Sequence, residues 1–146
     1  MTQNPPHLQP AVARSLATWH AMVASEDLSN LISIVHPQAV FRSPMAISPY
    51  ASAQALILVL GTVIQVFEDF TYHRELASAD GLNVVLEFSA RVADKQLKGI
   101  DLIRFDEQGK IVEFEVMVRP LSALQALGAE MGARLGQQMP AFKSKQ

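Results

Sequence analysis

One acidic residue of this chain lies where a charge is costly. Asp101 shares strand parity with Ile103 and Phe105, so the three side chains should project from one face of a strand. The next strand repeats the apolar alternation at Phe114 and Val116. An isolated carboxylate in such an interior must be paired, hydrogen-bonded or kept neutral by a raised pKa. The pattern predicts a polar anchor in a pocket, and the structural alternative is a carboxylate that pairs with an arginine or caps a loop.

Other reactive side chains are sparse. The chain has no cysteine, and its four histidines, His7, His20, His36 and His73, have no metal-ligand spacing with one another or with a carboxylate. His73 is a possible replacement base, but its parity opposes Phe70, so we expect it at a surface or an interface. No nucleophile elbow, phosphate-binding glycine loop or dinucleotide fingerprint occurs. We therefore expect no metal and no cofactor.

Composition limits the partners. The 146 residues suit one domain, and 49% of them are hydrophobic, so a lined cavity or a self-association surface is expected to absorb the surplus. A net charge of -2 gives no basic stripe for nucleic acid. No stretch reaches the roughly 18 apolar residues of a membrane span, and the start lacks a leader pattern, so a cytoplasmic location is expected.

The periodicity of the chain predicts its elements. Helical spacing covers 12–23 and, after a restart, 28–35, where Pro37 ends the second helix and places His36 at its end. A short strand at 39–43, an irregular stretch at 44–50 and a third helix over 56–67 follow. Alternation then predicts strands near 70–78, 83–92, 96–105 and 110–119, and an amphipathic helix covers 121–135.

This order predicts an α+β fold. The short turns make the last four strands an antiparallel meander, to which the strand at 39–43 is added. A curved antiparallel sheet would wrap around three N-terminal helices, an extra C-terminal helix would follow, and a blind pocket would remain. We expect a single domain over 1–146 with flexible ends at 1–8 and 137–146.

The order and one motif together resemble the nuclear transport factor two-like superfamily, in particular its ketosteroid isomerase and SnoaL-like polyketide cyclase branches. The likeness runs from about Val12 to Val118, and its most specific part is Ile100-Asp101 followed by 104–107 and 109–111. The resemblance implies a cone-shaped sheet, a homodimer formed by sheet-to-sheet contact, and an oxyanion-hole role for Asp101.

Two positions depart from the isomerase pattern. Trp19 stands where the isomerases use an oxyanion tyrosine, and Ser43 stands where they use a catalytic aspartate. A serine hydroxyl does not abstract a carbon-bound proton unaided, so the isomerase reaction is disfavoured. Trp19 retains a donor in its indole N–H, although a core aromatic is the simpler interpretation. A strand-end serine before a proline is the simpler interpretation of Ser43.

Three functions remain open. The first is binding of a small, largely apolar, carbonyl-containing molecule; the alternatives are an isomerase, cyclase or dehydratase with Asp101 as proton donor, and a dimeric interaction module without a ligand. In a dimer, Arg91 and Glu115 of the outer sheet face would pair. Candidate catalytic residues are Asp101, Trp19 and Ser43. The expected ligand-binding residues are apolar and face the interior: Val23, Phe41, Leu56, Val59, Leu60, Val63, Phe88, Ile103, Phe114, Val116 and Val118.

Overall fold

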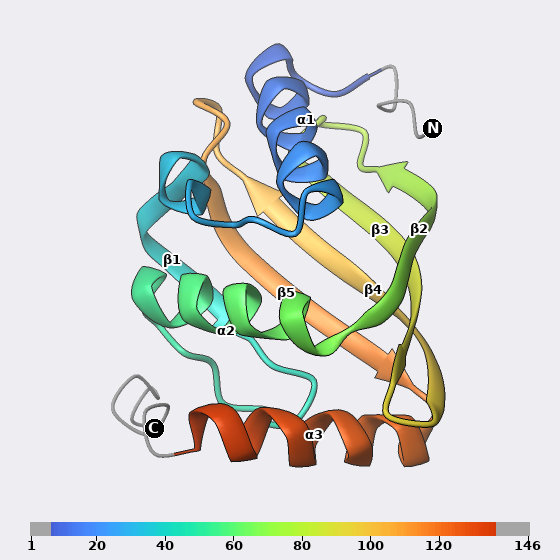
Figure 1. The fold of residues 1–146 in the computed structure, drawn as a ribbon. Coiled ribbons are helices and arrows are strands. Elements are labelled where there is room, and N and C mark those ends of the chain that lie inside the picture. Colours follow the sequence, from blue (N-terminus) through green and yellow to red (C-terminus); the bar gives the residue numbers. More distant parts are fainter. Residues whose placement is uncertain (1–6, 137–146) are drawn as a thin grey trace.

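The computed structural model describes residues 7–136, in which helices and strands alternate at first and four strands then follow in succession. The elements are α1 (Pro10–Ala24), the 3₁₀ turn η1 (Leu31–Ile34), β1 (Val35–Arg42), α2 (Ala53–Val66), β2 (Glu68–Ala77), β3 (Asn83–Val92), β4 (Lys95–Phe105), β5 (Ile111–Arg119) and α3 (Leu121–Leu135). Figure 1 shows them along the chain.

The five strands form one mixed sheet in the order β1-β5-β4-β3-β2. The antiparallel meander β2 to β5 is confirmed. The expectation of an entirely antiparallel sheet is wrong, because β1 pairs in parallel with β5 and places Phe41 beside Phe114. The chain reaches β5 from β1 through α2 and the other strands, so no short turn sets the direction of this pair.

The prediction of three N-terminal helices is also wrong, since α1 alone precedes the sheet. The segment expected to form a second helix contains only η1, and α2 follows β1. Pro37, interpreted as a helix end, lies inside β1 with His36. Because β1 is an edge strand, a missing N–H is tolerated there.

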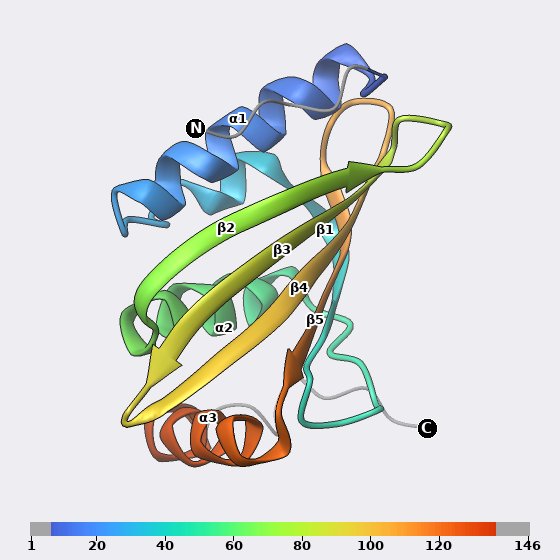
Figure 2. The ribbon, with the colours of Figure 1, turned by 90° about the vertical axis from the view of Figure 1, so that its right-hand side faces the viewer.

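All three α-helices lie on the concave side of the curved sheet. α1 and α3 cover opposite ends of this side, and α2 lies between them (Figures 1 and 2). Ser52 caps the N-terminus of α2, because its hydroxyl accepts a hydrogen bond from Ala55 N at 3.1 Å. The three helices and the sheet therefore surround the interior into which the inward side chains project.

The core joins the helices to the inner face of the sheet. Phe41, Phe88, Phe105 and Phe114 are fully buried, one from each of β1, β3, β4 and β5. Burial of these apolar side chains supplies the main favourable contribution to the free energy of folding. The core holds these strands in the register that positions Asp101.

The two chain ends predicted to be flexible fall mostly outside the described residues, which exclude 1–6 and 137–146. His7 and Leu8 are among the described residues: a His7 ring nitrogen is bonded to Ala77 O at 3.1 Å, and Leu8 packs against the core. No helix within 7–136 has the length and apolarity needed to cross a membrane.

Candidate functional site

Asp101 lies on β4, and its side chain is on the inner face of the sheet, as its strand parity predicted. Its neighbours in the sheet are Leu86 on β3 and Val116 on β5. The residue is 6% exposed, and apolar side chains surround it. No arginine pairs with it among residues 7–136, so the structural alternative of an arginine ion pair does not apply.

A chain of two hydrogen bonds ends at this carboxyl group. The Trp19 indole Nε1–H of α1 donates to the Tyr72 hydroxyl at 3.0 Å, and the Tyr72 O–H donates to Asp101 Oδ2 at 2.6 Å. Within the described part of the chain, Asp101 Oδ1 has no hydrogen-bond partner. The carboxyl group therefore offers one unpartnered oxygen, Oδ1, while its other oxygen accepts a hydrogen bond from Tyr72, which in turn accepts one from Trp19.

Burial governs the protonation of this pair. Desolvation raises the pKa of Asp101 from 3.8 to about 7, and the hydrogen bond from Tyr72 opposes that rise. Burial, and then the charge of Asp101, raise the pKa of Tyr72 well above its ordinary value. Tyr72 consequently remains a neutral donor, and Asp101 holds its proton in mildly acidic solution.

Asp101, Tyr72 and Trp19 line a cavity of about 510 Å³. The wall is mostly apolar and comes from the three helices, the inner face of the sheet and the segment after β1. The remaining lining residues are Val23, Leu28, Phe41, Ser43, Pro44, Met45, Tyr50, Val59, Leu60, Val63, Ile64, Phe67, Phe70, Val116, Leu127, Gly128, Met131, Gly132, Leu135 and Gly136.

The three candidate catalytic residues, Asp101, Trp19 and Ser43, all line this cavity. Trp19 directs its N–H to Tyr72, so that proton is already used within the protein. Ser43 Oγ accepts the N–H of Met45 at 3.0 Å and so shapes the turn after β1. The serine therefore has a local structural role in addition to its place on the wall.

The expected ligand-binding residues divide into two groups. Val23, Phe41, Val59, Leu60, Val63 and Val116 line the cavity. Leu56, Phe88, Ile103 and Phe114 are fully buried in the core behind the wall, and Val118 is partly buried against that core. Strand and helix parity identifies the inner face, but it does not separate residues at the cavity from residues packed beneath it.

Sequence reasoning missed Tyr72, the residue that bonds Asp101 to Trp19. Its parity with Phe70 placed it on the inner face, and a buried phenol requires a hydrogen-bond partner. The need of a buried Tyr72 hydroxyl for a hydrogen-bond partner was the signal that could have identified this residue. Tyr50 was missed as well; its backbone forms two hydrogen bonds with that of Phe41, at 2.8 and 2.9 Å, which close the segment after β1.

A second polar pair lies under α1. A His20 ring nitrogen is hydrogen-bonded to Glu75 Oε1, and the His20 ring stands edge-on to Tyr72 with centroids 5.2 Å apart. The Glu75 side chain is 3% exposed, and its Oε2 is buried without a partner among residues 7–136. Neither residue lines the 510 Å³ cavity, so this pair fixes α1 on β2 beside the site.

Acidic and imidazole groups do not gather into a metal site here. Within 7–136, no three such side chains come close enough to hold an ion together. Among the described residues, the polar side chains that line the cavity are those of Asp101, Tyr72, Tyr50, Trp19 and Ser43.

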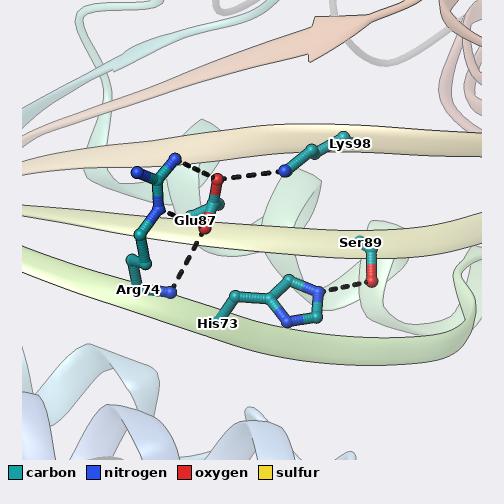
Figure 3. Close-up of polar contacts among 5 residues, drawn as sticks. All are labelled: His73, Arg74, Glu87, Ser89 and Lys98. Carbon is teal, nitrogen blue, oxygen red and sulfur yellow. Dashed lines mark hydrogen bonds and ion pairs between the residues drawn. The ribbon is translucent and has the colours of Figure 1, made fainter.

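The outer face of the sheet carries ionic contacts (Figure 3). Glu87 is 8% exposed and bonds to Arg74 at 2.7 and 2.8 Å and to Lys98 at 3.2 Å; hydrogen bonds from Arg74 lower the pKa of Glu87 to about 2. His73, expected at a surface or interface, is exposed and bonded to Ser89 at 2.7 Å. These charges are already compensated within one chain.

Arg91 also has partners in its own chain. It contacts Glu68 at 3.4 Å and Asp69 at 3.0 Å. The predicted pairing of Arg91 with Glu115 across a dimer would therefore compete with contacts that are already made.

Comparison with known proteins decides the family. A family model described as the SnoaL-like domain matches residues 16–114. The chain belongs to the SnoaL-like domain family. The resemblance drawn from the motif around Asp101 is thereby confirmed, and Trp19, Ser43, Tyr72 and Asp101 all lie within the matched residues of this SnoaL-like domain. α3 follows the matched part.

Solved structures agree with this assignment. A steroid delta-isomerase from Pseudomonas aeruginosa is 61% identical, has a TM-score of 0.87, and the match covers 91% of this chain and 97% of that one. An uncharacterized bacterial protein with a cystatin-like fold from Silicibacter pomeroyi is 29% identical (TM-score 0.81; 94% of each chain). An NTF2-like protein from Mesorhizobium loti is 17% identical (TM-score 0.69; 82% of this chain, 100% of that one) and shares the fold. No curated protein matches the sequence.

Proposed function

We propose that this SnoaL-like domain binds a small, largely apolar molecule through one carbonyl-type oxygen, which accepts a hydrogen bond from protonated Asp101. The observation that carries the proposal is the unpartnered Oδ1 of a buried carboxyl group in a mostly apolar cavity of about 510 Å³. A neutral carboxylic acid has one O–H to donate. With Oδ2 engaged by Tyr72, Oδ1 is the oxygen free to carry that proton toward a guest.

The hydrogen-bond chain strengthens this donor. Trp19 donates to Tyr72 and Tyr72 donates to Asp101, so each bond polarises the next in the same direction. The apolar wall contributes through burial of the guest's hydrocarbon, at about 25 cal/mol per Å². Oxygen recognition and apolar burial together define the ligand class as a hydrophobic ketone, aldehyde or enone.

Binding of acetylnaphthalene, an aromatic ketone, measured by titration calorimetry, tests the proposal. Affinity should be highest well below pH 7 and should fall by about tenfold or more as Asp101 ionises, because the donor is lost. Asp101→Asn keeps an N–H donor and should bind with weakened but pH-independent affinity. An Asp101→Asn variant with the wild-type affinity and pH profile would remove Asp101 from the site.

An isomerase is the second candidate, and the steroid delta-isomerase at 61% identity is the observation that favours it. Asp101, with its pKa raised to about 7, is suited to protonate a developing enolate. Among the described wall residues, however, no second carboxylate or imidazole is available as a separate base. We therefore place binding first.

Deuterium exchange separates these two functions. A ketone whose α-carbon is deprotonated in the site exchanges α-hydrogens with heavy water, which nuclear magnetic resonance detects. A binder leaves the exchange rate at the buffer background. Exchange that depends on the protein and disappears in Asp101→Asn would establish the isomerase-type function instead.

An interaction module with a vestigial pocket fits less well, because the cavity is not filled by Phe88, Ile103 and Phe114. Assembly as a homodimer through the outer sheet face remains part of the proposal. Met117 is 44% exposed there, beside a hollow lined by Ile100 and by the charged residues Glu87, Lys98 and Arg119. The exposed Met117 side chain favours contact with a second copy.

A further inference from the structure

α3 supplies the cavity wall on the side opposite α1. Five of its residues and the following Gly136 contribute, as pairs of an apolar side chain and a glycine: Leu127, Gly128, Met131, Gly132, Leu135 and Gly136. The glycines recur every four residues, so they occupy one face of the helix. α3 lies after the residues matched by the family model. The family model therefore does not describe this part of the wall.

The space beside each glycine is used differently. A Cβ built on Gly128 would lie 2.4 Å from Met45 Cε, so the Met45 side chain already occupies that space. A Cβ built on Gly132 would have no atom of residues 7–136 within 4 Å. Gly132 is exposed, so the open space beside it belongs to an exposed part of the cavity wall, whereas Met45 fills the space beside Gly128.

The same cavity holds a polar group that lacks a partner. Asp101 is 6% exposed, its Oδ1 is unpartnered within 7–136, and its hydrogen bonds lead through Tyr72 to Trp19 on α1. Figures 1 and 2 place α1 and α3 at opposite ends of the concave face. A guest held by its oxygen at Asp101 would thus extend its apolar body toward α3.

We propose that Gly132 is a specificity-determining residue: the space left by its missing side chain receives the far end of the guest and sets the longest guest that the cavity accepts. This inference rests on the proposed binding function and adds a limit on ligand length to it. The Met45 side chain, which packs against Gly128, borders that space.

Straight-chain methyl ketones of increasing length are suitable probes for this limit. In the wild-type protein, each added methylene should raise affinity by about fourfold until the chain fills the cavity. Gly132→Leu should end that rise several carbons earlier and weaken the longest ketones by about tenfold or more. Short ketones should bind as to the wild type. Gly132→Ala should shorten the limit by a smaller step.

The neighbouring residue provides the control. Ala133 is exposed like Gly132 but does not line the cavity, so Ala133→Leu should leave the length limit unchanged. The melting temperature of Gly132→Ala should not fall, because alanine favours helix more than glycine does. Lower affinity with intact stability would then reflect lost space.

The outcomes distinguish this inference from the binding proposal. Equal loss for short and long ketones in Gly132→Leu, no loss for either, or no length dependence in the wild type would overturn the role of Gly132. If Asp101→Asn leaves every affinity unchanged while Gly132→Leu still shortens the limit, the wall assignment holds and the role of Asp101 fails.

Discussion

Asp101, Tyr72 and Trp19 act as a unit. The carboxyl group is neutral below about pH 7 because burial disfavours its charge, and Tyr72 and Trp19 fix its orientation. Trp19 was expected either to fill the core or to donate to a ligand. It lies in the core, where it is 3% exposed and packs edge-on against Phe114 with ring centroids 5.3 Å apart. Its N–H donates to Tyr72 and not to a ligand.

The raised pKa of Asp101 predicts a pH-dependent stability. The folded-state pKa of about 7 exceeds the ordinary 3.8, so the stabilising contribution is complete below about pH 4 and is lost as pH rises through 7. Between these limits the free energy of unfolding should fall by about 1.4 kcal/mol per pH unit relative to Asp101→Asn. Urea unfolding of both proteins across this range measures the difference. Parallel pH profiles would contradict the buried neutral acid.

Removal of the Tyr72 hydroxyl should shift that titration upward. The hydrogen bond from Tyr72 lowers the pKa of Asp101, so Tyr72→Phe should raise it further above 7. The Trp19 N–H would lose its acceptor, at a cost of about 1–3 kcal/mol in stability. Carboxyl resonances of carbon-13-labelled protein report the titration midpoint. A midpoint that stays in place or moves down would contradict the proposed hydrogen-bond chain.

Among the helices and strands, the four-strand meander and the helices α1, α2 and α3 were predictable from sequence. Period-two alternation and short turns determine such strands locally, and parity correctly placed Asp101 on the inner face. The parallel β1–β5 pair and the 3₁₀ turn η1 were missed because they depend on tertiary contacts. The helix at 121–135 was predicted, but its glycine-lined wall was not, since a glycine gives no sign of the space beside it.

Gly99 of β4 offers a test of strand packing. A Cβ at this position would lie 2.4 Å from Met117 O and 2.6 Å from Phe88 Cζ, where the backbone cannot readily move. Gly99→Ala should therefore destabilise the fold by about 1–3 kcal/mol, as measured by urea unfolding. Gln96→Ala, at an exposed position of the same strand, should change stability by less than about 0.5 kcal/mol. Equal effects would show that β4 relaxes at Gly99.

For the molecule as a whole, family membership explains the fold, whereas the function has to be inferred from the residues that line the cavity. The fold of a steroid delta-isomerase is shared at 61% identity, and only the resemblance drawn from sequence predicts Ser43 at the place of the isomerase aspartate. One fold hosts several chemistries, so the groups on the wall decide between them. The inward position of Asp101 was predictable from strand parity, whereas its partner Tyr72 required the strand register.

Assembly is also testable for the whole chain. Native mass spectrometry of freshly purified protein should show a homodimer and should report any co-purified small molecule in the same spectrum. Met117→Glu places a charge on the outer face and should shift the mass toward the monomer. A wild-type monomer at micromolar concentration would contradict the dimer, while the cavity would be unaffected.

The carbonyl stretch of a bound ketone tests the central claim most directly. A hydrogen bond from neutral Asp101 should shift the infrared band of carbon-13-labelled acetylnaphthalene to lower frequency than in an apolar solvent. The shift should disappear in Asp101→Leu and above the pKa of about 7. A bound ketone whose carbonyl band matches the apolar solvent at about pH 5 would contradict donation by Asp101.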